Sequence, residues 1–296
     1  MKFDFIVGNP PYQDSSHSEK KNTLWRKFVE LSLNICDSDG YVGFIIPSSW
    51  MGSKSLLEKY FLKYNLLFIN KDECKKYFNI GSTFSYYILK KNNYGNSTKI
   101  VNKEINGEIA NINININDYI FDCFPRNLST ESNSILKKIF KFPYLGIRNI
   151  TTHHCVHRDR WRLVKDEEFK YPVYNTPSKL YFFNYEHIHQ NIPKIIIPTT
   201  TYFRNMFYTT YGTTQSFCYY LINEEEDYNI VLNNLNNIVF DYVNECFRYA
   251  NWNNVQLLKK LPKIPFDKFM DDDDIFNYFE LDSDEKNYIK RQIKWR

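Results

Sequence analysis

The stretch FDFIVGNPPY, residues 3–12, joins an apolar run to a turn that its own residues impose. Phe3 to Val7 is rich in aromatic and β-branched residues, which predicts a short buried strand. Gly8 and the pair Pro10-Pro11 end that strand, because proline has no amide hydrogen to give to a sheet and its ring fixes φ. The turn that begins at Asn9 therefore lies at the carboxyl end of a strand.

Alternating helices and strands follow this turn. Apolar residues at Leu24, Phe28, Leu31 and Ile35 recur three and four positions apart, which predicts an amphipathic helix. The elements expected over this part of the chain are helices at 24–36 and 53–64 and strands at 41–46, 66–70 and 84–89. Such alternation requires crossover connections, so we expect an α/β fold with a largely parallel sheet. Ligands bind such sheets at the carboxyl ends of the strands, where residues 9–12 and 47–50 both fall.

The second half of the chain is organised differently. Residues 92–118 are polar, and the alternating tract 111–117 predicts a hairpin or an edge strand. We place a domain boundary loosely within 120–140 and take 1–125 as one domain and 126–296 as the next. Short strand-like segments then alternate with turns as far as a helix expected at 230–247.

Charge is spread unevenly along the 296 residues, which carry a formal net charge of +4. Counted from the sequence, residues 136–210 have a net charge of +7 and residues 211–296 a net charge of −5. A basic middle segment favours a polyanionic partner such as nucleic acid.

Cellular location follows from the cysteines and the apolar runs. The six cysteines are scattered with no C-x-x-C pair, and no signal peptide precedes Asn9, so reduced thiols in a cytoplasmic compartment are expected. The many Asn, Ile and Lys residues indicate a bacterial, phage or other AT-rich genome. The longest apolar runs are only as long as strands, which argues against a membrane span.

The turn at Asn9 suits chemistry on a planar amine. The amino group of adenine is a weak nucleophile, because its lone pair is delocalised into the ring. Acceptors that hold both of its N–H groups can redirect the lone pair, and the Asn9 amide oxygen and the Pro10 carbonyl are suited to this. Two prolines fix the positions of these acceptors, and Tyr12 offers a face on which an extruded base can stack. A surface turn without function remains the alternative for the tetrapeptide alone.

With its context, FDFIVGNPPY resembles motif IV of the DNA adenine amino-methyltransferases, in the gamma-class arrangement of the Taq-type and Eco57-type enzymes. The likeness continues in order through LWRKFVELSL (24–33), DGYVGFIIPSSWM (39–51) and KKYFNIGSTFSYYILKK (75–91). It is weaker in the second half, at residues 146–160, 191–208 and 233–266. The resemblance implies a partial Rossmann-like methyltransferase sheet, the C-terminal half of a catalytic domain, followed by a mixed α+β target-recognition domain.

The resemblance also assigns roles within the site. Asn9, Pro10, Pro11 and Tyr12 would form the catalytic turn, and Asn9 would also contact the cofactor in part. Alignment on residues 75–91 gives the second base-stacking aromatic as Phe78. Phe84 and Tyr86 are less favoured, because strand alternation makes them core residues, and a plain core role for Phe78 is the alternative.

The cofactor implied is S-adenosyl-L-methionine, yet its glycine-rich loop is missing from the sequence. None of the nine glycines forms a G-x-G pair, and none follows Gly212. Three interpretations stay open: half of a split enzyme whose second polypeptide carries the cofactor-binding half, an inactive remnant, or a DNA-binding specificity subunit without transfer activity.

Candidates for contact with double-stranded DNA lie in the basic segment. Arg158, Arg160 and Arg162 surround an aromatic residue, and Arg148, Lys194 and Arg204 are supporting phosphate contacts. A solvated loop is the alternative. The run 153–157 has metal-ligand residue types, but its spacing fits no tetrahedral site, so we expect no metal.

One rival enzyme class also presents a planar amide to this motif, namely the protein-glutamine methyltransferases. That interpretation leaves the basic second half unexplained. The favoured hypothesis is therefore the catalytic-motif and target-recognition portion of a site-specific DNA adenine-N6 methyltransferase that acts on a flipped adenine.

Overall fold

The structure is a computed structural model that describes residues 2–13, 24–52, 61–78, 83–92, 95, 97–115, 124–149, 158–248 and 252–294. The chain divides into two compact units, residues 1–132 and 133–296. This division falls within helix α3 (Thr130–Ile139), slightly beyond the boundary at residue 125 taken from the sequence.

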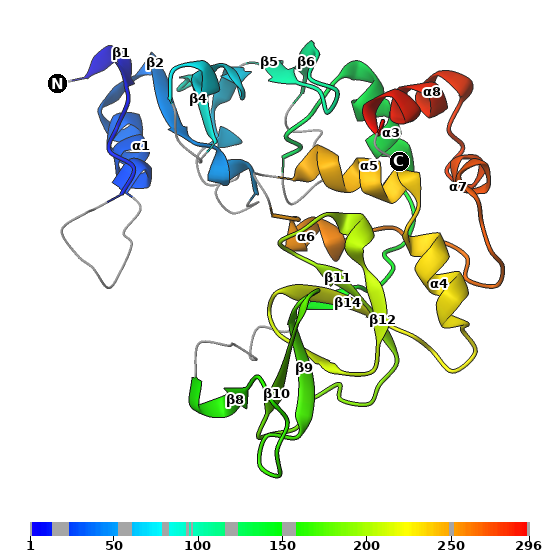
Figure 1. Cartoon of the computed structure of the whole chain (residues 1–296). Helices are drawn as coiled ribbons and strands as arrows, with labels where there is room; N and C mark the ends of the chain where they lie inside the picture. The colour runs from blue at the N-terminus through cyan, green and yellow to red at the C-terminus, as the bar shows by residue number, and fades with distance from the viewer. Residues whose placement is uncertain are drawn as a thin grey trace. The chain divides into compact units, whose positions relative to one another are not determined.

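Unit 1 is built on one six-stranded sheet in the order β1-β2-β4-β3-β5-β6 (Figure 1). Its elements are β1 (Phe3–Gly8), α1 (Leu24–Ile35), β2 (Cys36–Pro47), η1 (Ser48–Gly52), β3 (Asn65–Asn70), η3 (Glu73–Lys76), β4 (Phe84–Lys90), β5 (Thr98–Lys103) and β6 (Ile109–Ile114). Most of the helix expected at 53–64 lies outside the described residues.

The sheet is mixed, which corrects the expectation of a largely parallel one. β1 pairs with β2 and β3 with β5 in parallel, whereas β4 lies between β2 and β3 and runs antiparallel to both. The chain returns directly beside β3 instead of crossing over the sheet. Four strands, β1, β2, β3 and β5, still share one direction, so their carboxyl ends meet at one edge.

β2 follows α1 without the turn expected at residues 37–40, because the strand already begins at Cys36. Gly40 explains how β1 can lie so close to this irregular part of β2. A Cβ atom at Gly40 would stand 2.8 Å from the carbonyl oxygen of Phe3, closer than nonbonded atoms tolerate. The register between β1 and β2 shifts at the same point.

Helix α1 forms where the sequence predicts it but turns a different face inward. Its buried residues are Trp25, Val29, Ser32 and Leu33, and it packs against β2. Phe28 and Leu31, two members of the stripe used to predict the helix, are exposed. The helix therefore carries two apolar stripes, and unit 1 covers only one of them.

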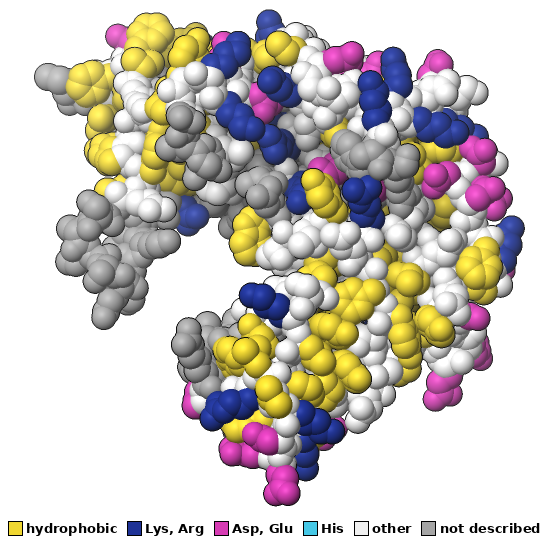
Figure 2. Space-filling model, in the orientation of Figure 1, with side chains coloured by type: hydrophobic (Ala, Val, Ile, Leu, Met, Phe, Trp, Pro, Cys, Tyr) yellow, Lys and Arg dark blue, Asp and Glu magenta, His cyan; other side chains and the backbone are white. Residues whose placement is uncertain are grey.

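β1 is an edge strand with exposed side chains, which corrects the expectation of a buried strand. Phe3, Phe5 and Val7 alternate onto one face, and Val7 is 79% exposed. The Phe5 ring stacks on Tyr41 of β2 with a centroid separation of 5.2 Å and is otherwise open to solvent. Figure 2 shows hydrophobic side chains gathered over this end of unit 1.

The opposite edge of the sheet is a polar hairpin, as the alternating tract predicts. β5 and β6 pair antiparallel from Thr98↔Ile114 to Lys103↔Ile109. Ala110, Ile112 and Ile114 point inward, while Asn111 and Asn113 are exposed. Exposed amides on an edge strand give little apolar surface to another chain.

Unit 2 contains two four-stranded sheets, β13-β9-β10-β8 and β12-β11-β14-β7. The strands are β7 (Arg148–Asn149), β8 (Trp161–Arg162), β9 (Tyr171–Thr176), β10 (Lys179–Phe183), β11 (Lys194–Pro198), β12 (Phe207–Thr209), β13 (Gly212–Thr213) and β14 (Phe217–Leu221). Short helical turns η5 (Arg158–Arg160) and η6 (Phe203–Asn205) precede β8 and β12. Tyr174 of β9 packs against Phe207 of β12, which joins the two sheets.

Unit 2 includes the part of α3 beyond residue 132, and its further described helices are α4 (Tyr228–Leu235), α5 (Ile238–Phe247), α6 (Val255–Leu258), α7 (Asp272–Tyr278) and α8 (Ser283–Gln292). The single helix expected at 230–247 is in fact α4 and α5. Asn237 separates them, because its side chain accepts a hydrogen bond from the Phe240 amide and so begins a new helix. None of the helices in the described parts of the chain has the length and apolar character needed to cross a lipid bilayer.

Candidate active site

The carboxyl edge of the unit 1 sheet brings together the residues that the sequence singled out. Asn9 directly follows β1, and in the segment 47–50 Pro47 ends β2 and residues 48–50 follow it. The first residue of the antiparallel strand β4, Phe84, pairs with Pro47 at the same edge. Trp50 is fully buried, and its indole nitrogen donates to the Ser85 hydroxyl at 3.2 Å. This hydrogen bond connects the segment after β2 to the start of β4.

The turn at Asn9 presents its amide to solvent. Asn9 and Pro11 are exposed, Pro10 is buried and Tyr12 is half-buried. The phenol of Tyr12 donates a hydrogen bond to the side-chain oxygen of Asn9. The carbonyl oxygen of Tyr12 accepts from the Leu24 amide at 3.1 Å, which ties the turn to the start of α1.

Phe78 lies near the same turn through a shared neighbour. It follows η3, and its amide donates to the Cys74 carbonyl at 3.1 Å. The Phe84 ring is 5.7 Å from that of Phe78 and 4.8 Å from that of Tyr12. Phe84 itself is buried, in agreement with the core role expected from strand alternation. The two proposed stacking residues therefore rest on one buried aromatic side chain.

The phenol of Tyr12 stays protonated at neutral pH. Partial burial raises the pKa of Tyr12, and this outweighs the opposite effect of its hydrogen bond to Asn9. A neutral phenol is a donor, so it orients the Asn9 amide with the oxygen toward Tyr12. An amide oxygen has two acceptor sites, and one of them remains for the N–H of a bound amine.

A cavity of 240 Å³ opens further along this edge, at the ends of β3 and β5. Its polar groups are largely satisfied within the chain. The Asn70 side-chain oxygen accepts from the amides of Asp72 and Glu73, and the Asp72 carboxylate accepts from the Lys103 amide at 2.7 Å. These bonds explain the shape of the turn and leave no basis for assigning a ligand.

S-adenosylmethionine does not fit the described residues as a complete site. Asn9 offers one exposed amide at the end of β1, but Gly8 and Gly43 are the only glycines close to it on β1 and β2, and they lie in regular strand. No glycine-rich turn or acidic side chain follows β1 or β2 in the parts of this edge that the structure describes. A cofactor would need further residues to be held here.

The arginines expected to contact DNA lie on both sheets of unit 2. Arg148 is exposed on β7, and Arg160 and Arg162 are exposed at η5 and β8. The Arg162 guanidinium lies 4.2 Å from the centre of the Phe169 ring, which holds it at the surface. Arg158 is part of η5, and its side chain is not among those described. Arg204 is half-buried in η6, beside Tyr202.

Lys194 is a correction to the set of DNA contacts. Its side chain is fully buried in β11, and its ammonium group donates to the carbonyl oxygens of His189 and Ile192 at 2.8 and 2.9 Å. Burial lowers the pKa of Lys194 to about 8. The residue fixes the loop before β11 and cannot reach a phosphate in this conformation.

The histidine-rich run at 153–157 lies outside the described residues. Within the described ranges, no group of three or more His, Cys, Asp or Glu side chains is placed to hold a metal ion.

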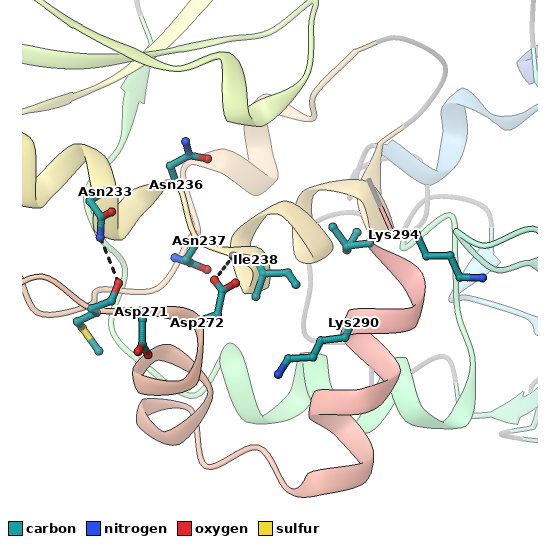
Figure 3. Close-up of a pocket in the computed structure, with 10 residues that line it drawn as sticks. Asn233, Asn236, Asn237, Ile238, Asp271, Asp272, Lys290 and Lys294 are labelled. Atoms are coloured by element: carbon teal, nitrogen blue, oxygen red, sulfur yellow. Dashed lines mark hydrogen bonds between the residues drawn. The ribbon is translucent and has the colours of Figure 1, made fainter. Parts of the chain in front are cut away.

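A larger hollow in unit 2 is lined by α4, α5, α7 and α8 (Figure 3). Asn233 donates to the carbonyl oxygen of Met270 at 3.1 Å, and Asp272 accepts from the Ile238 amide at 3.2 Å. Asn237 is the N-terminal cap of α5. These polar side chains thus stabilise the ends of helices, which accounts for their presence without a ligand.

Comparison with known proteins gives one family match. Residues 1–83 match the model of the Eco57I restriction-modification methylase family, which is less than a third of the chain. No curated protein sequence matches this chain.

Solved structures give only distant likenesses. A nuclease-deletion mutant of the Type ISP restriction-modification enzyme LlaGI, in complex with a DNA substrate mimic, is 12% identical over 98% of this chain and 34% of its own, with a TM-score of 0.47. The Type ISP enzyme LlaBIII bound to DNA is 11% identical over 88% and 26%, with a TM-score of 0.43. The type IIG restriction endonuclease BpuSI is 9% identical over 92% and 44%, with a TM-score of 0.35.

This chain spans less than half the length of each of these three proteins. At such identities and TM-scores, no activity can be carried over from them. The family match is more specific, because it covers the strand, the turn at Asn9 and the segment that contains Phe78. Residues 1–83 are therefore similar to restriction-modification methylases.

Proposed function

We propose that this chain is the catalytic-motif and target-recognition portion of a site-specific DNA adenine-N6 methyltransferase. Unit 1 would hold the flipped adenine, and unit 2 would contact the duplex through Arg148, Arg158, Arg160, Arg162 and Arg204. S-adenosyl-L-methionine supplies the methyl group when bound, and a second polypeptide would carry most of its site.

The observation that carries the proposal is the exposed Asn9 amide, oriented by Tyr12 at the carboxyl edge of the sheet. An acceptor fixed before the substrate arrives needs no reorganisation during the reaction, which is the main source of electrostatic catalysis in enzymes. Asn9 would accept one N–H of the adenine amino group, and the Pro10 carbonyl would accept the other. The lone pair of that nitrogen would then point away from the ring plane toward the methyl donor.

Tyr12 and Phe78 would stack on the two faces of the extruded base. Base stacking on an aromatic side chain contributes roughly 1–3 kcal/mol, which offsets part of the cost of removing the base from the duplex. The buried Phe84, in contact with both rings, would keep them in position. Phe84 is thus a positioning residue that sequence alternation identifies only as core.

The need for a second polypeptide is supported by the edge strand β1. Its backbone has no partner on the outer side among the described residues, and its neighbour α1 leaves Phe28 and Leu31 exposed. An exposed apolar edge strand is an aggregation hazard that natural proteins normally cover. A strand with apolar residues on both sides of it would pair with β1 and cover Phe5 and Val7. The partner we infer is therefore an α/β polypeptide that extends this sheet and carries a glycine-rich cofactor loop.

The first test is calorimetric titration of S-adenosylmethionine into the purified chain. No binding is expected, because the described edge lacks a glycine-rich turn. Micromolar binding would show that this chain builds a complete cofactor pocket and would overturn the need for a partner.

The catalytic role is tested by expressing the chain with a candidate cofactor-half polypeptide in a host without N6-methyladenine. Long-read sequencing of the host DNA should reveal methylated adenines within one sequence motif. Asn9→Ala should reduce that methylation by at least about 100-fold, which is the usual effect of removing a positioned acceptor or donor. Asn113→Ala is the matched control, because it removes an exposed amide from the edge strand β6 of the same unit.

Equal methylation by Asn9→Ala and the wild type would show that Asn9 does not orient the target amine. Absence of methylation in all reconstituted complexes, together with salt-dependent duplex binding, would favour a non-catalytic DNA-binding subunit.

A further inference from the structure

An exposed aromatic and cationic cluster in unit 2 has no role in the site described so far. It consists of Tyr202, with Arg204 and the buried Arg248 beside its ring, and of Trp252, whose neighbour Asn253 is hydrogen-bonded to the same loop. We name this set the Tyr202 platform. Tyr202 is 49% exposed and Trp252 is 61% exposed. Exposed aromatic side chains of this kind offer a flat apolar face next to a polar group, which suits them to contact with a planar ligand.

Two guanidinium groups lie within cation–π distance of the Tyr202 ring. The central guanidinium carbon of Arg204 is 5.3 Å from the ring centroid, and that of Arg248 is 4.8 Å from it. Arg248 is 8% exposed, and its terminal nitrogen is paired with Glu245 at 2.9 Å. Its Nε atom is buried and has no hydrogen-bond partner among the described residues. The ring therefore lies beside a fixed, buried guanidinium group whose charge is paired with Glu245.

A buried asparagine holds the platform rigid. The Asn253 side chain donates to the carbonyl oxygens of Pro198 and Thr201 at 2.7 and 2.9 Å, and its backbone amide donates to that of Thr199 at 2.8 Å. Asn244 donates to the Asn253 side-chain oxygen at 3.0 Å. These bonds fix the loop that ends in Tyr202 and also fix the residue directly after Trp252. The backbone that leads into Tyr202 is thus set in place before any ligand binds, which reduces the entropy lost on binding.

The chemistry of the cluster favours an unpaired nucleobase as its ligand. A flat ring with adjacent guanidinium groups offers π-faces and positive charge, and few directional groups that could read a base edge in a groove. Base–aromatic stacking of this kind is sequence-tolerant, and Arg adds cation–π and phosphate attraction. Tyr202 and Arg204 belong to the segment 136–210 with a net charge of +7, whereas Arg248 and Trp252 belong to the segment 211–296 with a net charge of −5. The positive charge that favours a polyanion over a neutral sugar or peptide therefore lies on the Arg204 side of the platform.

We infer that the Tyr202 platform stacks an unpaired base of the bound DNA, separate from the adenine held in unit 1. This inference rests on the proposed function, because it assumes that unit 2 binds DNA. Extrusion of one base leaves its partner unpaired, and such a base can leave the stack at low cost. The platform would bind a base of this kind in a sequence-independent way, so it adds affinity and not recognition of a motif.

The test measures binding of the full chain to two labelled DNA hairpins by fluorescence anisotropy at fixed salt. One hairpin is fully paired, and the other has one unpaired 2-aminopurine opposite an abasic site. The wild type should bind the second hairpin more tightly and quench its 2-aminopurine emission. Tyr202→Ala should weaken binding to this hairpin by about 5- to 100-fold, as expected for the loss of one stacking contact. Trp252→Ala should act in the same direction.

Tyr202→Phe keeps the ring and should retain the quenching and most of the affinity. Phe269→Ala is the matched control, because it removes an equally exposed aromatic side chain from the same unit and should change nothing. Unchanged affinity of each alanine variant for the fully paired hairpin would show that unit 2 remains folded.

The outcomes separate the two proposals. Wild-type binding to both hairpins with no loss in Tyr202→Ala or Trp252→Ala would overturn the platform and leave the proposed function intact. Failure of the wild type to bind any DNA would overturn the DNA-binding part of the proposed function, and the platform with it. Loss confined to the hairpin with the unpaired base would support both.

Discussion

The strands β1 and β11 have similar apolar sequences and opposite environments. Phe3 to Val7 forms an edge strand whose side chains are largely exposed, whereas every residue of β11 is buried between β12 and β14. Composition does not separate these two strands, because both are short and rich in branched or aromatic residues. Their neighbouring strands do, because among the described residues β11 pairs with a strand on each side, whereas β1 pairs with β2 alone. The exposure of β1 thus depends on which elements lie next to it and not on its own composition.

The two strands also differ in the burial of their charged residue. Asp4 of β1 is exposed, as expected for an edge strand. Lys194 of β11 is buried, and two carbonyl oxygens compensate its ammonium group. A buried charge is tolerated only where such acceptors are in place, so its burial marks a rigid part of unit 2. The following predictions test how far this contrast extends.

The largest difference is expected from truncating one branched side chain in each strand. Ile196→Ala should lower the free energy of unfolding by about 2–5 kcal/mol, because Ile196 is fully buried against Phe217 and Tyr219. Val7→Ala should change it by less than about 0.5 kcal/mol, because the side chain is already in water. Denaturant unfolding of the two variants measures both values. A cost above about 2 kcal/mol for Val7→Ala would show that β1 is covered in solution.

A smaller effect, up to about 3 kcal/mol, is expected from the ionisation of Lys194. Its folded pKa of about 8 lies below that of an ordinary lysine, so the unfolded chain binds the extra proton between these two values. The buried charge penalises the folded state below pH 8, and the penalty is relieved as the pH rises above 8. The wild type should therefore gain stability relative to Lys194→Met between about pH 8 and pH 10. A constant difference across this range would show that Lys194 has an ordinary pKa.

Loss of the helix cap between α4 and α5 should lower the free energy of unfolding by about 1–2 kcal/mol. Asn237→Ala removes the side-chain acceptor for the Phe240 amide at the start of α5. Asn111→Ala, on the exposed face of β6, is the comparison and should change the midpoint of thermal unfolding very little. A loss of stability no larger than that of Asn111→Ala would mean that Asn237 does not cap the helix.

The smallest effect on stability, below about 0.5 kcal/mol, is expected from a charge on the open edge. Val7→Lys should leave unfolding unchanged but should reduce self-association of the isolated chain, because a lysine blocks edge-to-edge pairing. Sedimentation velocity over a range of concentrations measures this. Leu163→Lys is the control, since it charges an exposed apolar residue that lies outside any strand. Equal self-association of Val7→Lys and the wild type would show that β1 is not the surface involved.

The candidate site was more predictable than the sheet around it. Gly8, Pro10 and Pro11 restrict their own backbone, so the end of β1 and the turn at Asn9 follow from local sterics. The hydrogen bond from Tyr12 to Asn9 spans three residues and belongs to the same local geometry. The contact of Phe84 with Tyr12 and Phe78 depends on strand order, so no periodicity could reveal it. The same holds for the Tyr202 platform, whose residues come from η6, the end of α5 and the segment before α6.

The sequence by itself determined the positions of β1 to β4, the extent of α1, the alternating edge strand β6 and the turn at Asn9. These features depend on residues a few positions apart, whose spacing and backbone limits are local. Only the tertiary structure decided that β4 runs antiparallel, that α1 buries Trp25 instead of Phe28, that β1 is exposed and that Lys194 is buried. Each of these depends on which elements become neighbours, and neighbours are chosen by the total apolar area that the whole unit can bury.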